Sequence, residues 1–163
     1  MRTKLFITFF LFIAMLPVYA QKIACVDMGK VSENSTEVAA EKKKMEEMYK
    51  QSRKKLETKQ NELMKLQEKL KKEGSTASTD AQRAMGEEYQ RQLMELQQMA
   101  QEEEKKLADK EAKTYSDFIE KVKKIAMKIA IQKGYDLVLA KEQLLYIDDK
   151  LDITKFVTAE INK

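Results

Sequence analysis

Apolar residues along most of this chain recur at the spacing of an α-helix. Residues 31–133 are rich in charged, helix-forming side chains, and the one clear break is the small-residue stretch at 74–78. In the first half, apolar residues return every seven positions at Tyr49, Leu56, Leu63 and Leu70. This pattern predicts a long antiparallel helical hairpin, or arm, over residues 32–133 with its turn near 74–79.

The apolar faces of the predicted hairpin contain polar gaps. In the first helix, the complementary seam position holds two apolar and two polar residues: Met45, Ser52, Lys59 and Leu66. The return helix has an eleven-residue period through Leu107, Phe118 and Ile129, which favours nearly straight or slightly right-handed packing. Glu103 and Lys110 are further gaps. The seam is therefore weaker than that of a committed leucine zipper.

Helix-ending and helix-capping residues flank both halves of the hairpin. Gly74 suits the left-handed conformation that ends many helices, and Gly134 stops the return helix. Side chains that can cap the helix N-termini are Ser32 or Asn34 for the first helix and Thr79 or Asp80 for the second.

The two ends of the chain predict a small β-containing base. Residues 22–27 form an apolar, β-branched strand, and residues 135–141 and 143–147 predict two more strands around a tight turn at Glu142. A short helix over 155–162, capped by Thr154 or Asp152, ends the chain. The expected fold is mostly α with a small β part, and the base comprises residues 21–31 and 134–163. The candidate assembly residues are Ile23, Val26, Leu137, Val138, Leu139, Leu145 and Ile147.

This base is too small to close a sizeable core alone, because small domains bury a low fraction of their surface. We therefore expect the bases of several copies to merge into an oligomer.

Residues 1–20 have the layout of a cleaved secretory signal. Arg2 and Lys4 precede a short apolar run, and a small-residue site ends at Ala20, after which we expect cleavage. The single cysteine, Cys25, cannot form a disulfide within one chain. It is interpreted as a packed strand residue; pairing between subunits, a free thiol and a lipid anchor are the alternatives.

The composition argues against catalysis and nucleic-acid binding. Without Arg2 and Lys4 the basic residues fall from 31 to 29 against 27 acidic ones, which leaves a nearly balanced chain with a net charge of about +2, whereas a nucleic-acid binder should show a clustered basic face. The chain contains no histidine, the commonest general base and metal ligand. The acidic runs at 87–88 and 102–104 are interpreted as solvated helix faces. We expect no enzyme, no cofactor, no metal and no nucleic acid.

Two sets of arm residues are candidates for binding. Methionine is flexible and polarizable, so Met-rich surfaces adapt to varied apolar partners, although each Met can also fill gaps in the seam. These candidates are Met45, Met48, Met64, Met94 and Met99. A basic set near the turn can attract an acidic partner or a negatively charged membrane surface, or can simply keep the helix soluble. It consists of Lys69, Lys71, Lys72 and Arg83.

The chain resembles the Skp/OmpH family of periplasmic chaperones over its mature length. The resemblance is carried by residues 22–31 (KIACVDMGKV), residues 134–139 (GYDLVL) and residues 151–154 (LDIT) around a long charged hairpin. It implies a homotrimer whose base strands form a small barrel-like body, with three arms around a cavity. It also implies ATP-independent binding of unfolded outer-membrane proteins in the periplasm, with lipopolysaccharide as a further partner whose contact residues cannot be assigned.

Two other functions fit parts of the pattern. A structural coiled-coil spacer of the cell envelope, with no client, requires a continuous apolar seam, which the polar gaps interrupt. A peripheral membrane protein requires a broad apolar face with large aromatic side chains, and the arms offer few of these.

Overall fold

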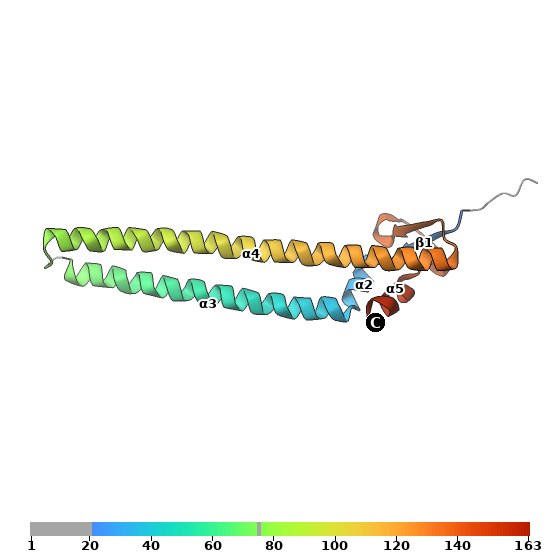
Figure 1. Ribbon diagram of the computed structural model, residues 1–163, viewed down its shortest axis with the longest axis horizontal. Helices are drawn as coiled ribbons and strands as arrows, with labels where there is room; N and C mark the ends of the chain where they lie inside the picture. Colours follow the sequence, from blue (N-terminus) through green and yellow to red (C-terminus); the bar gives the residue numbers. More distant parts are fainter. Residues whose placement is uncertain (1–20, 75) are drawn as a thin grey trace, which may run out of the picture.

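The computed structural model describes residues 21–74 and 76–163, and it shows a long helical hairpin joined at one end to a small base (Figure 1). The predicted signal peptide, residues 1–20, lies outside the described residues. In chain order the elements are β1 (Ile23–Val26), α2 (Met28–Glu33), α3 (Thr36–Glu73), α4 (Thr79–Lys133), β2 (Leu137–Ala140), η2 (Lys141–Gln143), η3 (Asp149–Leu151) and α5 (Thr154–Ile161). The predicted class, mostly α with a small β part, is confirmed.

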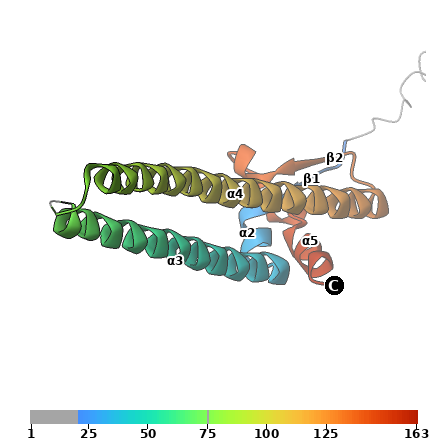
Figure 2. The same ribbon diagram turned by 60° about the vertical axis from the view of Figure 1, so that its left-hand side comes forward.

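The two long helices form the arm and run side by side in both views (Figures 1 and 2). Helix α3 has 38 residues and α4 has 55 residues. At about 1.5 Å per residue, α4 is roughly 80 Å long. Because α4 is the longer helix, its C-terminal part extends past the start of α3 and packs on the base.

Both long helices are capped by serines other than the residues that the sequence suggested. The Ser35 hydroxyl accepts a hydrogen bond from the Val38 amide at 3.3 Å, and the Ser78 hydroxyl accepts one from the Ala81 amide at 3.4 Å. The predicted cap of the first long helix was wrong because residues 28–33 form a separate short helix, α2, ahead of the arm. The predicted caps had been Ser32 or Asn34 and Thr79 or Asp80.

The two glycines that end the long helices do so in different ways. Gly134 has φ 69°, the left-handed conformation, and its amide donates to the Ala130 carbonyl. Gly74 instead stays right-handed, with φ −59° and ψ −35°, so the predicted left-handed conformation there was wrong. A Cβ at position 74 would lie 2.3 Å from the Leu70 carbonyl oxygen, which explains a glycine at this turn.

The base contains a two-stranded parallel sheet. Strand β1 pairs with β2 from Ile23 opposite Leu137 to Val26 opposite Ala140. Parallel neighbours need a long connection, and here the whole helical arm supplies it. The predicted strand at 143–147 is not formed: residues 141–143 make a 3₁₀ turn, and residues 144–147 have no strand partner in the described part of the chain. Leu144 is extended, with φ −110° and ψ 134°, but within the described chain no sheet edge pairs with it.

The hydrophobic core lies where the base meets the end of α4. It gathers side chains from β1, α2, α4 and α5, namely Ala24, Val26, Val31, Val122, Ala126, Ile129, Ile153, Val157 and Ile161. Phe156 of α5 lies outside this core: it is 51% exposed, and the Lys133 ammonium lies 3.9 Å from its ring centroid.

Hydrogen bonds join the two ends of the chain around this core. The Ile153 amide donates to the Cys25 carbonyl at 2.9 Å. The Asp27 amide donates to the Thr154 hydroxyl at 2.9 Å. The last residues also hold the start of the arm, because the Asn162 side-chain oxygen accepts from the Thr36 amide at 2.9 Å. The arm root is therefore fixed to the base by the C-terminal segment.

Cys25 is a packed core residue of β1, as the sequence interpretation held. Its side chain is fully buried and forms no disulfide. Burial, followed by the nearby Asp152 carboxylate, raises the pKa of the Cys25 thiol. The thiol is therefore neutral and poorly reactive at neutral pH.

Candidate functional site

The seam between α3 and α4 is held by ion pairs at the positions where the apolar repeat fails. Glu41 pairs with Lys110 at 2.9 Å, and Lys59 pairs with Glu95 at 2.9 Å. Two further pairs cross the seam, between Lys55 and Glu103 and between Glu37 and Lys121. The predicted gap at Ser52 also faces inward, since this side chain is only 5% exposed.

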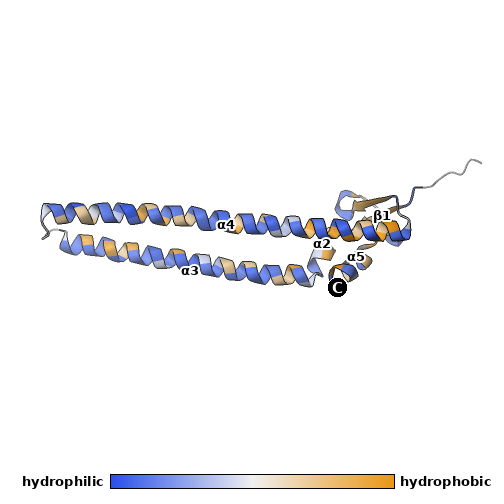
Figure 3. Ribbon diagram, viewed as in Figure 1, coloured by the Kyte–Doolittle hydropathy of each residue, from blue (hydrophilic) through white to orange (hydrophobic). Residues whose placement is uncertain are grey.

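Two seam carboxylates, Glu41 and Glu103, stay ionised at neutral pH because lysines hydrogen-bond to them. Hydrogen bonds from Lys44 and then Lys110 lower the pKa of Glu41 to about 2. A hydrogen bond from Lys55 lowers the pKa of Glu103. Solvent-accessible pairs of this kind contribute less to stability than a fully buried leucine would. The arm is thus held together weakly along its length, and its surface stays hydrophilic (Figure 3).

The candidate methionines do not share one surface. Met64 on α3 and Met94 on α4 are 57% and 62% exposed. Met45, Met48 and Met99 are half-buried, as expected of side chains that fill gaps near the seam. The exposed pair is therefore available to a partner, whereas the half-buried three also contribute to the packing of the arm.

The basic candidates lie together at the free end of the arm. Lys69, Lys71, Lys72 and Arg83 are all exposed. Within the helices, Lys69 is 3.9 Å from Glu73 and Arg83 is 3.2 Å from Glu87. Lys71 and Lys72 occupy the last turn of α3, where positive charge is favoured by the helix dipole. The arm tip therefore presents basic side chains to solvent.

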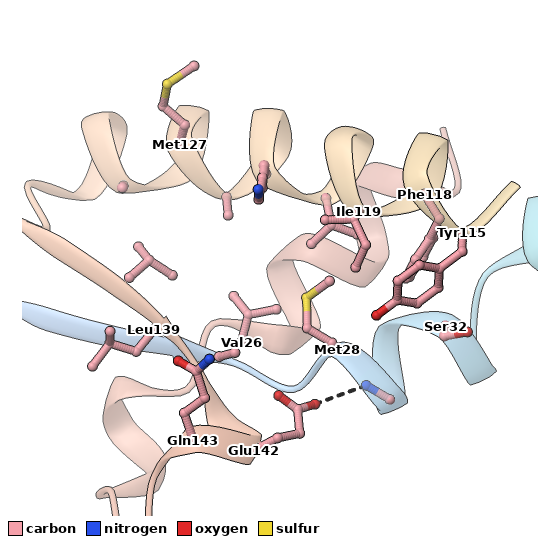
Figure 4. Close-up of a pocket in the computed structure, with 17 residues that line it drawn as sticks. Val26, Met28, Ser32, Tyr115, Phe118, Ile119, Met127, Leu139, Glu142 and Gln143 are labelled. Atoms are coloured by element: carbon pink, nitrogen blue, oxygen red, sulfur yellow. Dashed lines mark hydrogen bonds between the residues drawn. The ribbon is translucent and has the colours of Figure 1, made fainter. Parts of the chain in front are cut away.

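An apolar groove of about 940 Å³ opens at the base, between α4 and β2 (Figure 4). Its α4 side includes Tyr115, Phe118 and Ile119, and its strand side includes Val138 and Leu139. A second hollow of about 540 Å³ continues toward the arm and shares Tyr115 and Phe118 with the first. Tyr115 is 68% exposed although its ring lies in an apolar setting.

The candidate assembly residues differ in exposure: one is buried in the core of the base, and others lie on its surface. Val26 is in the core at 3% exposure, while Ile23, Val138, Leu139 and Ile147 are half-buried. Leu137 is 44% exposed and Leu145 is 108% exposed, next to Tyr146 at 87%. Large apolar side chains are thus exposed to solvent on the base of the described chain.

The sequence analysis did not assign the groove residues of α4 to any site. Phe118 entered that analysis only as part of the eleven-residue period of the return helix. The missing signal is non-local, since the groove exists only because β2 returns beside α4.

The described residues show no arrangement for metal chemistry or membrane crossing. Across residues 21–74 and 76–163, no three His, Cys, Asp or Glu side chains gather in a way that could hold a metal ion. None of the helices in these ranges combines the length and apolar character needed to cross a bilayer.

The fold and its surfaces define a class of protein that acts by binding: a charged helical arm on a small base with exposed apolar patches. Comparison with known proteins gives the family. The family described as "Outer membrane protein (OmpH-like)" matches residues 22–161, so the chain belongs to the OmpH family. The resemblance that the sequence suggested is confirmed.

Two relatives illustrate the likeness. The chain is 22% identical to the chaperone protein Skp of Pectobacterium atrosepticum over 142 residues, which cover 87% of this chain and 86% of the relative. The crystal structure of an OmpH-like protein from Caulobacter crescentus superposes with a TM-score of 0.79 at 16% identity. The match covers 88% of this chain and 85% of that one, and it concerns the fold.

Proposed function

We propose that this protein is an ATP-independent holdase chaperone that binds unfolded outer-membrane β-barrel proteins in the periplasm. The observation that carries the proposal is the seam of the arm, where buried Ser52 and interhelical ion pairs replace a continuous apolar stripe. A rigid spacer gains nothing from such dilution. An arm that must adapt its shape to an irregular unfolded client gains flexibility from it. Membership of the OmpH family, with a relative named as a chaperone, supports the same function.

The mechanism rests on many weak contacts. Precursors of outer-membrane barrels expose alternating apolar residues and aggregate in water. Exposed Met64 and Met94 offer polarizable apolar contacts, and the surrounding charged side chains keep the arm soluble. No single contact is strong enough to fix one conformation of the guest, so the guest stays soluble and can leave.

The proposed working form is a homotrimer in which three bases join and three arms enclose a cavity. The small core of the base and the exposed apolar residues beside it support self-association. The proposed location is the periplasm, which the signal-like layout of residues 1–20 in the sequence, with cleavage after Ala20, supports. The basic side chains at the arm tip, including Lys71 and Arg83, attract a negatively charged membrane surface or lipopolysaccharide.

The test is an aggregation assay on an outer-membrane barrel protein diluted from urea, with the chain from Gln21 added and no nucleotide present. We expect light scattering to fall in proportion to added protein and to reach a plateau at a fixed stoichiometry. A soluble protein of equal mass serves as the control. Unchanged scattering at excess chaperone would contradict the proposal and favour the client-free spacer.

A further inference from the structure

The part of the arm nearest the base has no buried side chain on either helix. None of residues 36–51 of α3 is buried, and the first buried position of this helix is Ser52. None of residues 108–121 of α4 is buried either, and the nearest buried side chains of α4 are Leu107 and Val122. These two stretches are called the proximal arm below. The core of the described chain includes no side chain of α3, so apolar packing does not fix the proximal part of α3 to the base.

The two helices are also not closely packed against each other in the proximal arm. The hollow of about 540 Å³ lies between them, with Val38 and Met45 on the α3 side and Ala112 and Phe118 on the α4 side. The hydroxyl oxygen of Thr114 lines the same hollow, is buried, and has no hydrogen-bond partner among the described residues. Side chains that border a gap lose part of their van der Waals attraction. The helices therefore gain little from contact here.

Polar contacts hold the start of α3 in place instead. The Asn162 side chain, which follows α5 directly, makes three hydrogen bonds with residues at the start of α3. Its Oδ1 accepts from the Thr36 amide at 2.9 Å and from the Thr36 hydroxyl at 3.2 Å. Its Nδ2 donates to the Asn34 carbonyl at 2.8 Å. Asn162 thus acts as a second cap for α3, supplied from the other end of the chain.

This cap has a firm support, whereas the other contacts of the proximal arm are exposed. Val157 and Ile161 of α5 are buried in the core, so Asn162 is attached directly to the base. The ion pair between Glu37 of α3 and Lys121 of α4 is accessible to solvent on both sides, with the two side chains 56% and 43% exposed. Solvent and salt screen such a pair. The hydrogen bonds of Asn162 are therefore the main attachment of the start of α3.

We propose that Asn162 is a clamp that holds α3 against α4, and that its release lets residues 36–51 move away from α4 and open the hollow. Helix α4 stays on the base, because Val122 and Ile129 anchor it in the core. Farther along the arm the helices stay paired, because Leu63 is buried between them. The movement therefore takes place within one hairpin and exposes the apolar lining of the hollow. It depends only on contacts within one chain, and holds whether or not the chain binds a client.

The first test is hydrogen exchange on Asn162→Ala in the chain from Gln21. Asn162 is exposed, so the substitution leaves the core unchanged. We expect the amides of residues 37–48 to exchange about tenfold faster than in the parent, because the start of α3 loses its clamp. Exchange in residues 122–133 should not change. The matched control is Lys163→Ala, since Lys163 is exposed and pairs with a carboxylate of α5 rather than with α3.

A conservative substitution distinguishes the clamp from a general role in α5. Asn162→Asp keeps an oxygen that can accept from the Thr36 amide, and it places a negative charge at the N-terminus of α3, where the helix dipole favours it. It loses the hydrogen bond to the Asn34 carbonyl. We expect exchange in residues 37–48 to stay within about threefold of the parent. Exchange as fast as in Asn162→Ala would contradict the proposed contact with α3.

The second test measures how fast a cysteine inside the hollow reacts with a maleimide. Val38→Cys places a thiol on the α3 side of the hollow. Combined with Asn162→Ala, it should react about tenfold faster than in the Val38→Cys single variant. Leu63→Cys is the matched control, because Leu63 is 9% exposed and lies beyond the proximal arm, and it should react equally slowly with and without Asn162→Ala. Cys25 is buried, so the chain without an added cysteine gives the background rate.

Local opening and general loosening give different results in these tests. Faster labelling confined to Val38→Cys, with slow exchange restored by Asn162→Asp, supports the clamp. Faster exchange throughout α4, or faster labelling of Leu63→Cys, would show that Asn162 stabilises the whole fold and would overturn the proposal. Unchanged labelling of Val38→Cys in the Asn162→Ala background would also overturn it, because the two helices would then stay together without the clamp.

Discussion

Lys141 donates a hydrogen bond through Nζ to Oδ2 of Asp152 at 2.6 Å, tying the turn after β2 to the residues that precede α5. Asp152 also accepts from the Thr154 amide at 2.9 Å, as expected of a residue that helps to start the last helix. The first predicted cap, Thr154, instead uses its hydroxyl to accept from the Asp27 amide. The Asp152 carboxylate thus connects the turn after β2 to the start of α5, and the Thr154 hydroxyl connects that start to Asp27.

This carboxylate should make the base sensitive to acid. Partial burial raises the pKa of Asp152, but the hydrogen bonds from Lys141 and Thr154 outweigh it and lower the pKa from 3.8 to about 2. The unfolded chain therefore binds the proton more tightly, and the stabilisation, about 2 kcal/mol, is complete above about pH 4 and is lost between pH 4 and 2. Asp152→Asn should lower the free energy of unfolding by about 1–2 kcal/mol at pH 7 and flatten its decline below pH 4. Urea titrations at several pH values test this, and parallel acid profiles for both proteins would contradict it.

Gly134, which ends α4, and Gly86, which lies inside α4, predict opposite effects of alanine. At Gly134, φ is 69°, so alanine there should destabilise the chain by about 1–2 kcal/mol. At Gly86, inside α4, an added Cβ meets nothing within 4 Å, and alanine should stabilise by about 0.5–1 kcal/mol. Thermal unfolding of the two variants against the parent measures both. Equal shifts of the same sign would refute the assignment of Gly134 as a left-handed helix end.

Removing a seam charge should stiffen the arm. The Lys59 side chain is 17% exposed and pairs with Glu95, which is 44% exposed and so remains solvated without its partner. Lys59→Met keeps the length of the stem and should raise the free energy of unfolding by about 0.5–1 kcal/mol while reducing its salt dependence. The control is Lys50→Met, because Lys50 is 69% exposed and pairs only within α3. Urea unfolding of both variants and the parent at low and high salt measures the change. A loss of stability in Lys59→Met would show that the ion pair outweighs apolar packing.

The exposed and half-buried methionines should separate binding from folding. Met64→Ser with Met94→Ser changes two exposed side chains, so the free energy of unfolding should stay within about 0.5 kcal/mol of the parent while suppression of client aggregation weakens. Met45→Ser with Met48→Ser removes half-buried apolar contacts and should cost about 1 kcal/mol each. Light scattering and urea unfolding are measured on both variants. Full suppression by the first variant would remove Met64 and Met94 from the client surface.

The arm tip should bind anionic surfaces through its basic side chains. Each basic residue near such a membrane contributes about 1 kcal/mol, so neutralising Lys69, Lys71, Lys72 and Arg83 with glutamine should weaken binding to phosphatidylglycerol vesicles at least about tenfold. A matched variant changes Lys42, Lys43, Lys50 and Lys54 to glutamine, which gives the same net charge without touching the tip. Vesicle flotation at low salt compares the two. Equal losses would mean that net charge, rather than the tip, governs the attraction.

Much of the arm follows from the sequence because helices are local structures. The heptad through Leu56 and Leu63, the break after residue 73 and the stop at Gly134 need only neighbours a few residues away. The polar seam was also visible, since Lys59 and Ser52 stand at positions that must face the other helix. The caps were missed by one to three residues because several neighbouring side chains can accept a hydrogen bond from the same backbone amide.

The base was decided by tertiary structure. That β1 and β2 are parallel neighbours, that Asn162 holds the start of α3 and that a groove opens beside Ile119 all depend on residues more than a hundred positions apart or on the packing between them. Residues 144–147 show the principle most clearly. Their apolar, extended pattern is a property of the sequence, but a strand also needs an edge that supplies its hydrogen bonds, and only the assembled fold provides edges.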